Sequence, residues 1–379
     1  MMLKMYDHFN LRPQKAREVY VYSEDGKRYL DTFAGIGVLT FGHSYPELLR
    51  AVKNKMDKYM HISNYILDED AEYVAKRLVE FTGKDGKVFF TNSGTESAEA
   101  ALKAVKKCAT KKRKKIIYFK NGFHGRTLGA LSINGIERLR KPFGELLPST
   151  VELSFNDVEE FNDYMDSHGE EVLAVFFEPI QGAGGIIPMD QEFSDVIKGN
   201  HERYKFILVS DEIQAGLGRT GKIYAYQHYG LDPDIIIVAK ALGGGLPLGA
   251  AIFLKEAQNI LKRGDHGSTF APNPVSAAGA RYVVDHIEKL LPSVREKGEY
   301  FVEEIKKINS NRVVDIRGKG LMIGIELDKS YTDLKQKAFE RGLLLNIISN
   351  YKVIRLLPAL IITHEEIDEI VRVLKELIC

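Results

Sequence analysis

The sequence predicts an α/β fold built on a mostly parallel β-sheet that is buried on both faces. Short apolar runs recur from residue 87 onward, and longer amphipathic stretches such as SAEAALKAVKK (97–107) lie between them. The runs do not alternate apolar with polar residues, which is typical of strands covered on both faces. The expected strands are KVFF (87–90), KIIYF (115–119), LAVFF (173–177), FILVS (206–210), DIIIVA (234–239) and AAIFL (250–254).

The two ends of the chain have a different pattern. VYVYSEDGKRYLD (19–31) indicates a hairpin around Asp25-Gly26, and residues 275–379 combine helical stretches with short alternating runs such as LMIGIEL (321–327). We expect these ends to form a smaller α+β domain, with a boundary in the Gly- and Pro-rich stretch at 265–275. The expected units are a segment packing with the small domain (1–44), a large domain (45–270) and a C-terminal small domain (271–379).

The overall composition argues against several classes of protein. The net charge is +1, so no global field draws the chain to nucleic acid or to anionic membranes. The apolar runs are far shorter than the roughly 18 residues of a membrane helix, and MMLKMYDHFN lacks the apolar core of a signal peptide. Two cysteines give no disulfide framework, and the ten histidines show no metal-binding spacing. We therefore expect a cytoplasmic protein without a metal site.

One basic run, KKCATKKRKK (106–115), allows two interpretations. It could bind nucleic acid, or it could be the solvated end of a helix that leads into the strand at 115–119. No aromatic residue interleaves with the basic ones, and the whole chain is nearly neutral, which favours the solvated helix end. We expect no nucleic-acid partner.

Polar and glycine residues gather directly after five of the expected strands. Ligands bind at the carboxyl ends of strands in such sheets. The pattern therefore predicts one site built from five loops. These loops contain TNSGTES (91–97), KNGFHGRT (120–127), EPIQG (178–182), DEIQ (211–214) and Lys240.

The loop around Gly94 and the end of the strand at 206–210 suggest two parts of this site. A helix that begins at Ser93-Gly94-Thr95 offers free N–H groups to a phosphate. The alternative is an ordinary helix cap, because Ser93 and Glu96 have the spacing of a capping box. A buried carboxylate at Asp211 needs a cation, which could be a protonated pyridine ring or a structural arginine.

An aromatic residue and a lysine complete the pattern. Phe123, followed by His124, could stack on a flat cofactor or simply fill the core. Lys240 follows a buried apolar run, and a desolvated lysine amine is a nucleophile toward carbonyl groups. A phosphate cradle, a buried acid, a flat-ring stacker and a buried amine together describe a site for pyridoxal 5'-phosphate.

At this point the sequence resembles the class-III (ω-) aminotransferases of fold type I, which include acetylornithine, ornithine and 4-aminobutyrate aminotransferases. The resemblance covers residues 20–375 and implies a large domain with a seven-stranded, mostly parallel sheet. The motifs that carry it are DGKRYLDTFAGIGVLTFGHSYP, NSGTES, FHGRT, EPIQG, DEIQAGLGRTG, PDIIIVAKALGGGLPLGA, GSTFAPNP and VIRLLPAL.

The resemblance implies a role for each residue of the cofactor site. Lys240 forms a Schiff base with the cofactor and shuttles a proton, while Asp211 keeps the pyridine nitrogen protonated. Gln214 bonds the ring hydroxyl, and Phe123 stacks on the ring. The expected cofactor-binding residues are Ser93, Gly94, Thr95, Phe123, His124, Asp211, Gln214, Lys240 and Thr269.

The resemblance also implies how substrates and a second subunit take part. Arg355 binds the α-carboxylate of glutamate and 2-oxoglutarate, and Arg126 binds the other substrate carboxylate. Glu178 pairs with Arg355 and masks it while an ω-amino donor is bound. Thr269 holds the phosphate of the neighbouring subunit, which implies a homodimer.

The expected reaction is ping-pong transfer of the terminal amine of an ω-amino donor to 2-oxoglutarate, giving an aldehyde and glutamate. N-acetylornithine is the favoured donor, then ornithine, then 4-aminobutyrate, and the pocket near Ile36 and Val38 is expected to influence that choice. The sequence departs from the family pattern at Ala183 and Pro272, which leaves the exact donor open.

Three alternatives remain beside this interpretation. A glutamate-1-semialdehyde aminomutase shares the fold but lacks FHGRT and the GLGRTG stretch found at 216–221. GLGRTGK (216–222) nearly matches a nucleotide-binding loop, but Ile223 stands where Ser or Thr should follow. A non-catalytic binding module of the same fold is disfavoured by Lys240, Asp211 and Gln214.

Overall fold

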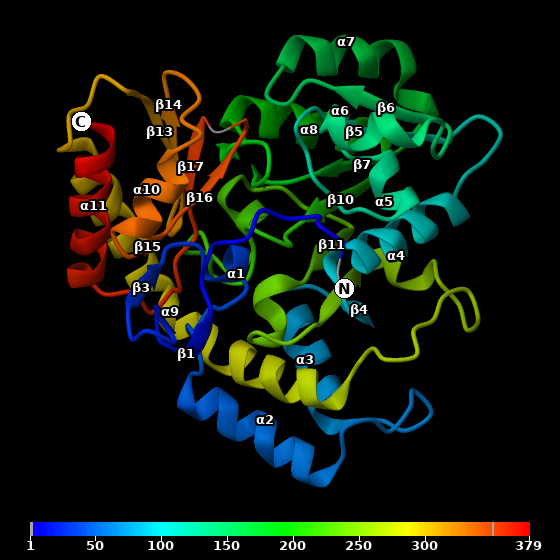
Figure 1. Ribbon diagram of the computed structural model, residues 1–379. Helices are drawn as coiled ribbons and strands as arrows, with labels where there is room; N and C mark the ends of the chain where they lie inside the picture. The colour runs from blue at the N-terminus through cyan, green and yellow to red at the C-terminus, as the bar shows by residue number, and fades with distance from the viewer. Residues whose placement is uncertain (1–2, 351) are drawn as a thin grey trace.

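The computed structural model describes residues 3–350 and 352–379 and contains a seven-stranded sheet, which confirms the α/β fold class. Figure 1 shows this sheet in one lobe of the molecule and smaller sheets in the other. Its strand order is β4-β12-β11-β10-β7-β5-β6. The strands are β4 (Gly86–Thr91), β5 (Lys115–Phe119), β6 (Thr150–Leu153), β7 (Val172–Phe177), β10 (Ile207–Asp211), β11 (Ile235–Val238) and β12 (Gly249–Leu254).

Strand direction brings the carboxyl ends together. β10 is parallel to β7 and β11, and β5 is parallel to β6 and β7. β12 is antiparallel to both β11 and β4, so β4 points the same way as β11. The loops after β4, β5, β7, β10 and β11 therefore lie along one edge of the sheet, as the sequence predicts.

Both faces of the sheet are covered, which explains the unbroken apolar runs. In β11, Ile235 and Ile237 belong to one core cluster, whereas Ile236 and Val238 belong to another. The first cluster contains α4 (Gly94–Lys107), and the second contains residues of α3 (Glu69–Glu80), α7 (Val158–His168) and α8 (Gln191–Tyr204). The basic run at 106–115 forms the end of α4 and the turn into β5.

The other lobe is built from both ends of the chain. The predicted hairpin is present as β2 (Tyr20–Ser23) and β3 (Arg28–Asp31). Beside it lie β1 (Pro13–Arg17) and, from the far end of the chain, β15 (Leu343–Leu344), which pairs with β3. A further sheet has the order β13-β14-β17-β16, with β13 (Val313–Lys319), β14 (Met322–Leu327), β17 (Val353–Leu356) and β16 (Asn346–Ile348). The expected boundaries at 44/45 and 270/271 stay a prediction.

Helices and short elements complete the described chain. The 33-residue helix α9 (Pro274–Lys306) packs against α2 (Pro46–Lys58) and α3, and also contacts the C-terminal helix α11 (His364–Ile378). The remaining elements are α1 (Ala34–Gly37), α5 (Leu128–Ser132), α6 (Glu137–Arg140), α10 (Leu334–Glu340), β8 (Ile180–Gln181), β9 (Ile187–Pro188) and the 3-10 turns η1 (Lys141–Phe143), η2 (Gly169–Glu171), η3 (Ala225–His228), η4 (Lys240–Gly243) and η5 (Lys255–Asn259).

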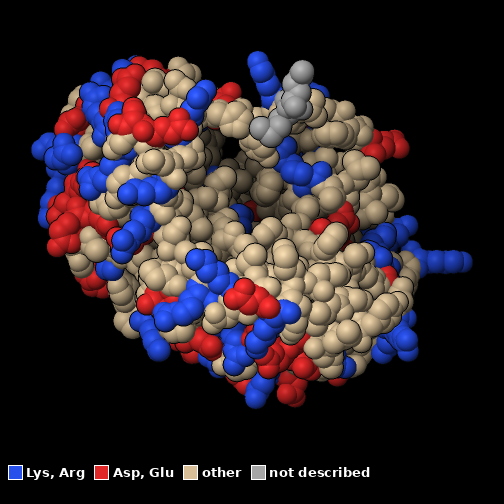
Figure 2. Space-filling view, turned by 60° about the horizontal axis from the view of Figure 1, so that its bottom comes forward, with Lys and Arg blue, Asp and Glu red and all other residues tan. Residues whose placement is uncertain are grey.

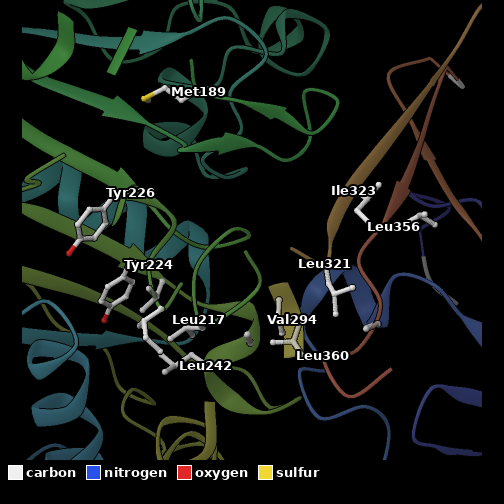
Figure 3. Packing of buried hydrophobic residues seen from close by; sticks show 14 of the residues in the cluster. Met189, Leu217, Tyr224, Tyr226, Leu242, Val294, Leu321, Ile323, Leu356 and Leu360 are labelled. Carbon is white, nitrogen blue, oxygen red and sulfur yellow. The ribbon is translucent and has the colours of Figure 1, made fainter. Parts of the chain in front are cut away.

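One hydrophobic core runs through both lobes. Leu217 and Leu242 from the large sheet's loops share a cluster with Val294 of α9, Leu321 and Leu360 (Figure 3). This shared core fixes the C-terminal sheet beside the carboxyl edge of the large sheet. Within residues 3–350 and 352–379, no helix is both long and apolar enough to cross a membrane.

Candidate active site

Lys240 lies one residue beyond β11 and opens the turn η4. Its backbone is left-handed, with φ at 40°, and Gly243 and Gly244 follow. Burial lowers the pKa of Lys240 to about 8, although the charge of Asp211 opposes this change. Arg355 adds to the lowering, and Glu178 opposes it. An amine in this setting reaches its neutral, nucleophilic form far more readily than an exposed lysine.

Asp211 lies at the end of β10 with its carboxylate buried. One oxygen accepts from the N–H of Ile213 at 3.0 Å, and the other lies 2.7 Å from Nδ1 of His124. Burial opposes a charge on His124, but its hydrogen bond to Asp211 and the charges of Asp211 and Glu178 together outweigh that effect and raise its pKa. The structure therefore places His124 against the buried acid.

The loop between β4 and α4 is shaped as a cradle. Ser93 caps α4 by accepting from the N–H of Glu96 at 3.3 Å. The reciprocal bond goes to Asn92 instead, because Glu96 accepts the backbone N–H of Asn92 at 2.6 Å. The helix cap is therefore compatible with phosphate binding. Gly94 and Thr95 lie in the first turn of α4, where backbone N–H groups have no partner within the helix.

A cavity of about 460 Å³ joins this cradle to the lysine. Its lining includes Ser93, Gly94, Thr95, Phe123, His124, Arg126, Lys240 and also Val38. The guanidinium of Arg126 lies 5.6 Å from the centre of the Phe123 ring and is exposed. A helix N-terminus, an aromatic ring and a depressed-pKa amine around one cavity suit a flat, phosphorylated aldehyde.

Arg355 and Glu178 lie close to this cavity but do not form the expected pair. Among the described residues, no ion pair joins them; Arg355 instead donates to Asn346 at 2.8 Å and Gln214 at 3.3 Å. Glu178 accepts the N–H groups of Phe123 and Gly182 at 2.8 and 3.1 Å. Each side chain is held by other partners in this conformation, and the pairing of Glu178 with Arg355 while an ω-amino donor is bound stays a prediction.

The charge of Glu178 nevertheless acts on Arg355. Burial lowers the pKa of Arg355 to about 10, and Glu178 opposes that change. Burial also raises the pKa of Glu178 to about 7, while His124 opposes the rise. The amide of Gln214 lies against Gly182, where an added Cβ would lie 2.2 Å from the Gln214 amide oxygen. A side chain at position 182 would therefore displace Gln214.

Thr269 is not brought into this cavity within the chain. It lies exposed between Ser268, whose hydroxyl contacts Asn92 at 3.2 Å, and the exposed Phe270. Its role toward a neighbouring subunit stays a prediction.

The stretch at 216–222 does not resemble a free phosphate loop, because Arg219 is buried and donates to the carbonyl groups of Leu321 and Pro358.

Two residues near the site have no counterpart in the sequence-based prediction. Asn346 accepts from Arg355, and Glu212 is a second buried carboxylate next to Asp211. A signal for Glu212 was present, since it follows a buried strand as Asp211 does. Asn346 had no such signal, because its position opposite Arg355 depends on strand pairing between β16 and β17.

Comparison with known proteins agrees with this geometry. The pattern of the family described as "Aminotransferase class-III" matches residues 1–378. The acetylornithine aminotransferase of Aquifex aeolicus is 42% identical, over 100% of this chain and 99% of that protein. The succinylornithine transaminase of Photorhabdus laumondii is 39% identical, over 94% and 90%. A structure of the Toxoplasma gondii ornithine aminotransferase with partially occupied PLP superposes with a TM-score of 0.93, at 27% identity, covering 99% and 91%.

Proposed function

The chain belongs to the class-III aminotransferases, whose cofactor is pyridoxal 5'-phosphate, and we propose that it transfers the terminal amine of N-acetylornithine to 2-oxoglutarate. The products would be an aldehyde and glutamate. One observation supports the binding of a substrate carboxylate, such as that of 2-oxoglutarate. Arg355 is a buried cation that only two neutral side chains hold, beside the Lys240 cavity. A substrate carboxylate would supply the missing negative charge.

We infer the cofactor's position from the residues that fit its parts. Lys240 would hold the aldehyde carbon, and Asp211, positioned by His124, would hold the pyridine nitrogen. Ser93, Gly94 and Thr95 would bind the phosphate, with Phe123 against the ring and Gln214 at its hydroxyl. When bound, the cofactor supplies an electron sink for the carbon that carries the amine.

The protein's own groups then move the proton. The neutral Nζ of Lys240, once free, could accept a proton from the amine-bearing carbon and deliver it to the former aldehyde carbon of the cofactor. Its depressed pKa favours the neutral form that this step requires.

The donor assignment rests on the relatives and on the two arginines. The relatives named above act on acetylated and succinylated ornithine by their names, so an ornithine-type donor is favoured over 4-aminobutyrate. Arg126, exposed at the cavity wall, would bind the donor's carboxylate. Glu178 would offset the charge of Arg355 while such a donor is bound. Neither Ala183 nor Pro272 lines the described cavity, so neither argues against this donor.

We also propose that the protein acts as a homodimer. Figure 2 shows a broad area with few charged side chains and a hollow that contains Lys or Arg atoms. Exposed apolar side chains occur in the neighbouring stretches 60–67 and 268–272, with Tyr65 at 97% and Phe270 at 62% exposure. Asn64 donates to the carbonyl of Ser268, which ties the two stretches together. A second copy that covers them would meet the loop carrying Thr269.

The test is a steady-state assay of the purified holoenzyme with each donor and 2-oxoglutarate. We expect the highest kcat/KM with N-acetylornithine, and we expect Arg355→Ala to impair the 2-oxoglutarate half-reaction. A fully active Arg355→Ala variant would remove the proposed acceptor site. Product formation without any keto acid would instead favour an aminomutase.

A further inference from the structure

The environment of Arg355 contains an unexpected partner. Its Nε donates to Oδ1 of Asn346 at 2.8 Å, and one terminal nitrogen donates to Oε1 of Gln214 at 3.3 Å. A guanidinium has only donors, so both amides must present oxygen to it. Among the described residues no carboxylate forms an ion pair with Arg355, although Arg355 is only 5% exposed. The two amides therefore orient the guanidinium group, but they do not neutralise its positive charge.

Strand pairing fixes Asn346 in this place. β17 lies between β14 and β16, and the residues directly opposite Arg355 are Gly324 on β14 and Asn346 on β16. Side chains that face each other across paired strands lie on the same face of the sheet. Because Gly324 has no side chain, Asn346 is the cross-strand neighbour that can orient the guanidinium.

Glu178 is held on the other side by a different set of bonds. Its two oxygens accept the N–H groups of Phe123 and Gly182, so its carboxylate is tied to the backbone of two loops. The charge of Glu178 still opposes the lowering of the Arg355 pKa by burial. Two buried opposite charges gain by direct contact when nothing else holds them. The bonds to Asn346 and Gln214 are the restraints on the arginine that oppose such contact, and the shorter of the two is the bond to Asn346.

We propose that Asn346 is a positioning residue that keeps the Arg355 guanidinium apart from Glu178 and open to a substrate carboxylate. This inference rests on the proposed role of Arg355 in binding 2-oxoglutarate. Loss of the Asn346 side chain releases Nε, and the guanidinium can then turn to Glu178. An aspartate at the same position instead places a carboxylate beside Nε and neutralises the charge directly.

The two half-reactions separate this role from a general structural one. The proposed donor binds its carboxylate at Arg126, so its half-reaction does not need a free Arg355. Each half-reaction of the holoenzyme can be followed alone in single-turnover experiments through the absorbance of the bound cofactor. Asn346→Ala and Asn346→Asp are the test variants. Asn311→Ala and Asn311→Asp are matched controls, because Asn311 is exposed in the same lobe.

We expect Asn346→Ala to raise the half-saturating concentration of 2-oxoglutarate roughly tenfold, because a hydrogen bond to a charged group is lost. Asn346→Asp should raise it further, while both variants keep the donor half-reaction within about twofold of the wild type. The Asn311 variants should match the wild type in both half-reactions. An equal loss in both half-reactions, or an unchanged response to 2-oxoglutarate, would overturn the inference.

Arg355→Ala, measured in parallel, separates the two proposals. If Arg355→Ala leaves the 2-oxoglutarate half-reaction intact, the proposed acceptor site itself is wrong. If Arg355→Ala impairs that half-reaction and the Asn346 variants do not, only the role of Asn346 is wrong. Thermal unfolding of every variant identifies one that has not folded, and Asn346→Ser then replaces it in the same assay.

Discussion

Nδ1 of His124 lies 2.7 Å from Oδ2 of Asp211, and both side chains are buried at the carboxyl edge of the large sheet. The other oxygen of Asp211 is bonded to the N–H of Ile213. Asp211 is therefore oriented from two sides, by the loop after β5 and by its own loop after β10. A carboxylate fixed in this way can face a pyridinium nitrogen without reorganising when the cofactor binds.

This contact makes the role of His124 testable. His124→Ala removes the partner of one Asp211 oxygen, so we expect kcat to fall roughly tenfold or more and cofactor to dissociate faster. His124→Asn keeps a donor near that oxygen and should recover much of the loss. Steady-state kinetics and cofactor release measure both effects. Equal activity of the alanine variant and the wild type would show that Asp211 needs no such partner.

The depressed pKa of Lys240 predicts how the cofactor-free protein takes up pyridoxal 5'-phosphate. Only the neutral amine attacks the aldehyde, and its fraction rises as the pH rises through the pKa of about 8. The rate of reconstitution should therefore increase with pH and level off above that midpoint. Stopped-flow absorbance at a series of pH values measures it. A rate that keeps rising toward the ordinary lysine pKa of 10.5 would show that burial does not depress this amine.

Glu212 should contribute to stability rather than to chemistry. Its buried carboxylate accepts N–H bonds from Ala225 and Tyr226 at 2.7 and 2.8 Å, and Ser210 lies 3.1 Å away. Glu212→Gln turns one acceptor into a donor that faces another donor, which should cost about 2 kcal/mol of unfolding free energy. Chemical denaturation of the cofactor-free protein measures this. An unchanged unfolding free energy would contradict the importance of these bonds.

Glu212 also predicts a pH dependence of stability. Burial raises its pKa from 4.5 to about 7, and its backbone bonds oppose the rise. Between these values the folded state keeps a proton that the unfolded state has lost. This group's contribution to stability is thus fully present below pH 4.5 and is lost as the pH rises through about 7. Comparing wild type with Glu212→Gln across this range isolates it, and parallel pH profiles would contradict the raised pKa.

Ile36 occupies a strained turn two residues before Val38, which lines the cavity. Ala34, Gly35, Ile36 and Gly37 all have positive φ, and Ile36 lies at φ 67° and ψ 50°, where a β-branched residue is disfavoured. The residue is 38% exposed, so only part of its surface packs against the protein to offset the strain. Ile36→Gly should therefore raise the unfolding free energy by about 1 kcal/mol. Thermal and denaturant unfolding test this, and a less stable variant would mean that Ile36 packing outweighs the strain.

The loops that form the site could be predicted because each directly follows an unbroken apolar run in the sequence. Unbroken apolar runs mark the strands, and the residues after them meet once those strands are parallel. β6 was missed because Thr150–Leu153 reads TVEL, and only Leu153 of this edge strand is buried. An edge strand with one covered residue leaves no continuous apolar run.

Other parts of the site depend on tertiary contacts that no local pattern encodes. The left-handed turn at 34–37 contains Ile36, a β-branched residue for which no local pattern predicts a positive φ. The bond between Asn346 and Arg355 depends on the register of β16 and β17. The missing Glu178–Arg355 contact reflects competition from backbone N–H groups and from two amides, which can be judged only in three dimensions.

The most direct test of the account is to locate the covalent attachment of the cofactor. The purified holoenzyme would be reduced with borohydride, digested and analysed by mass spectrometry, with Lys240→Ala as the control. We expect a pyridoxyl-phosphate adduct on Lys240 and no such adduct in the variant, which should also be inactive. An adduct on another lysine, or a fully active Lys240→Ala enzyme, would contradict the assignment of the site.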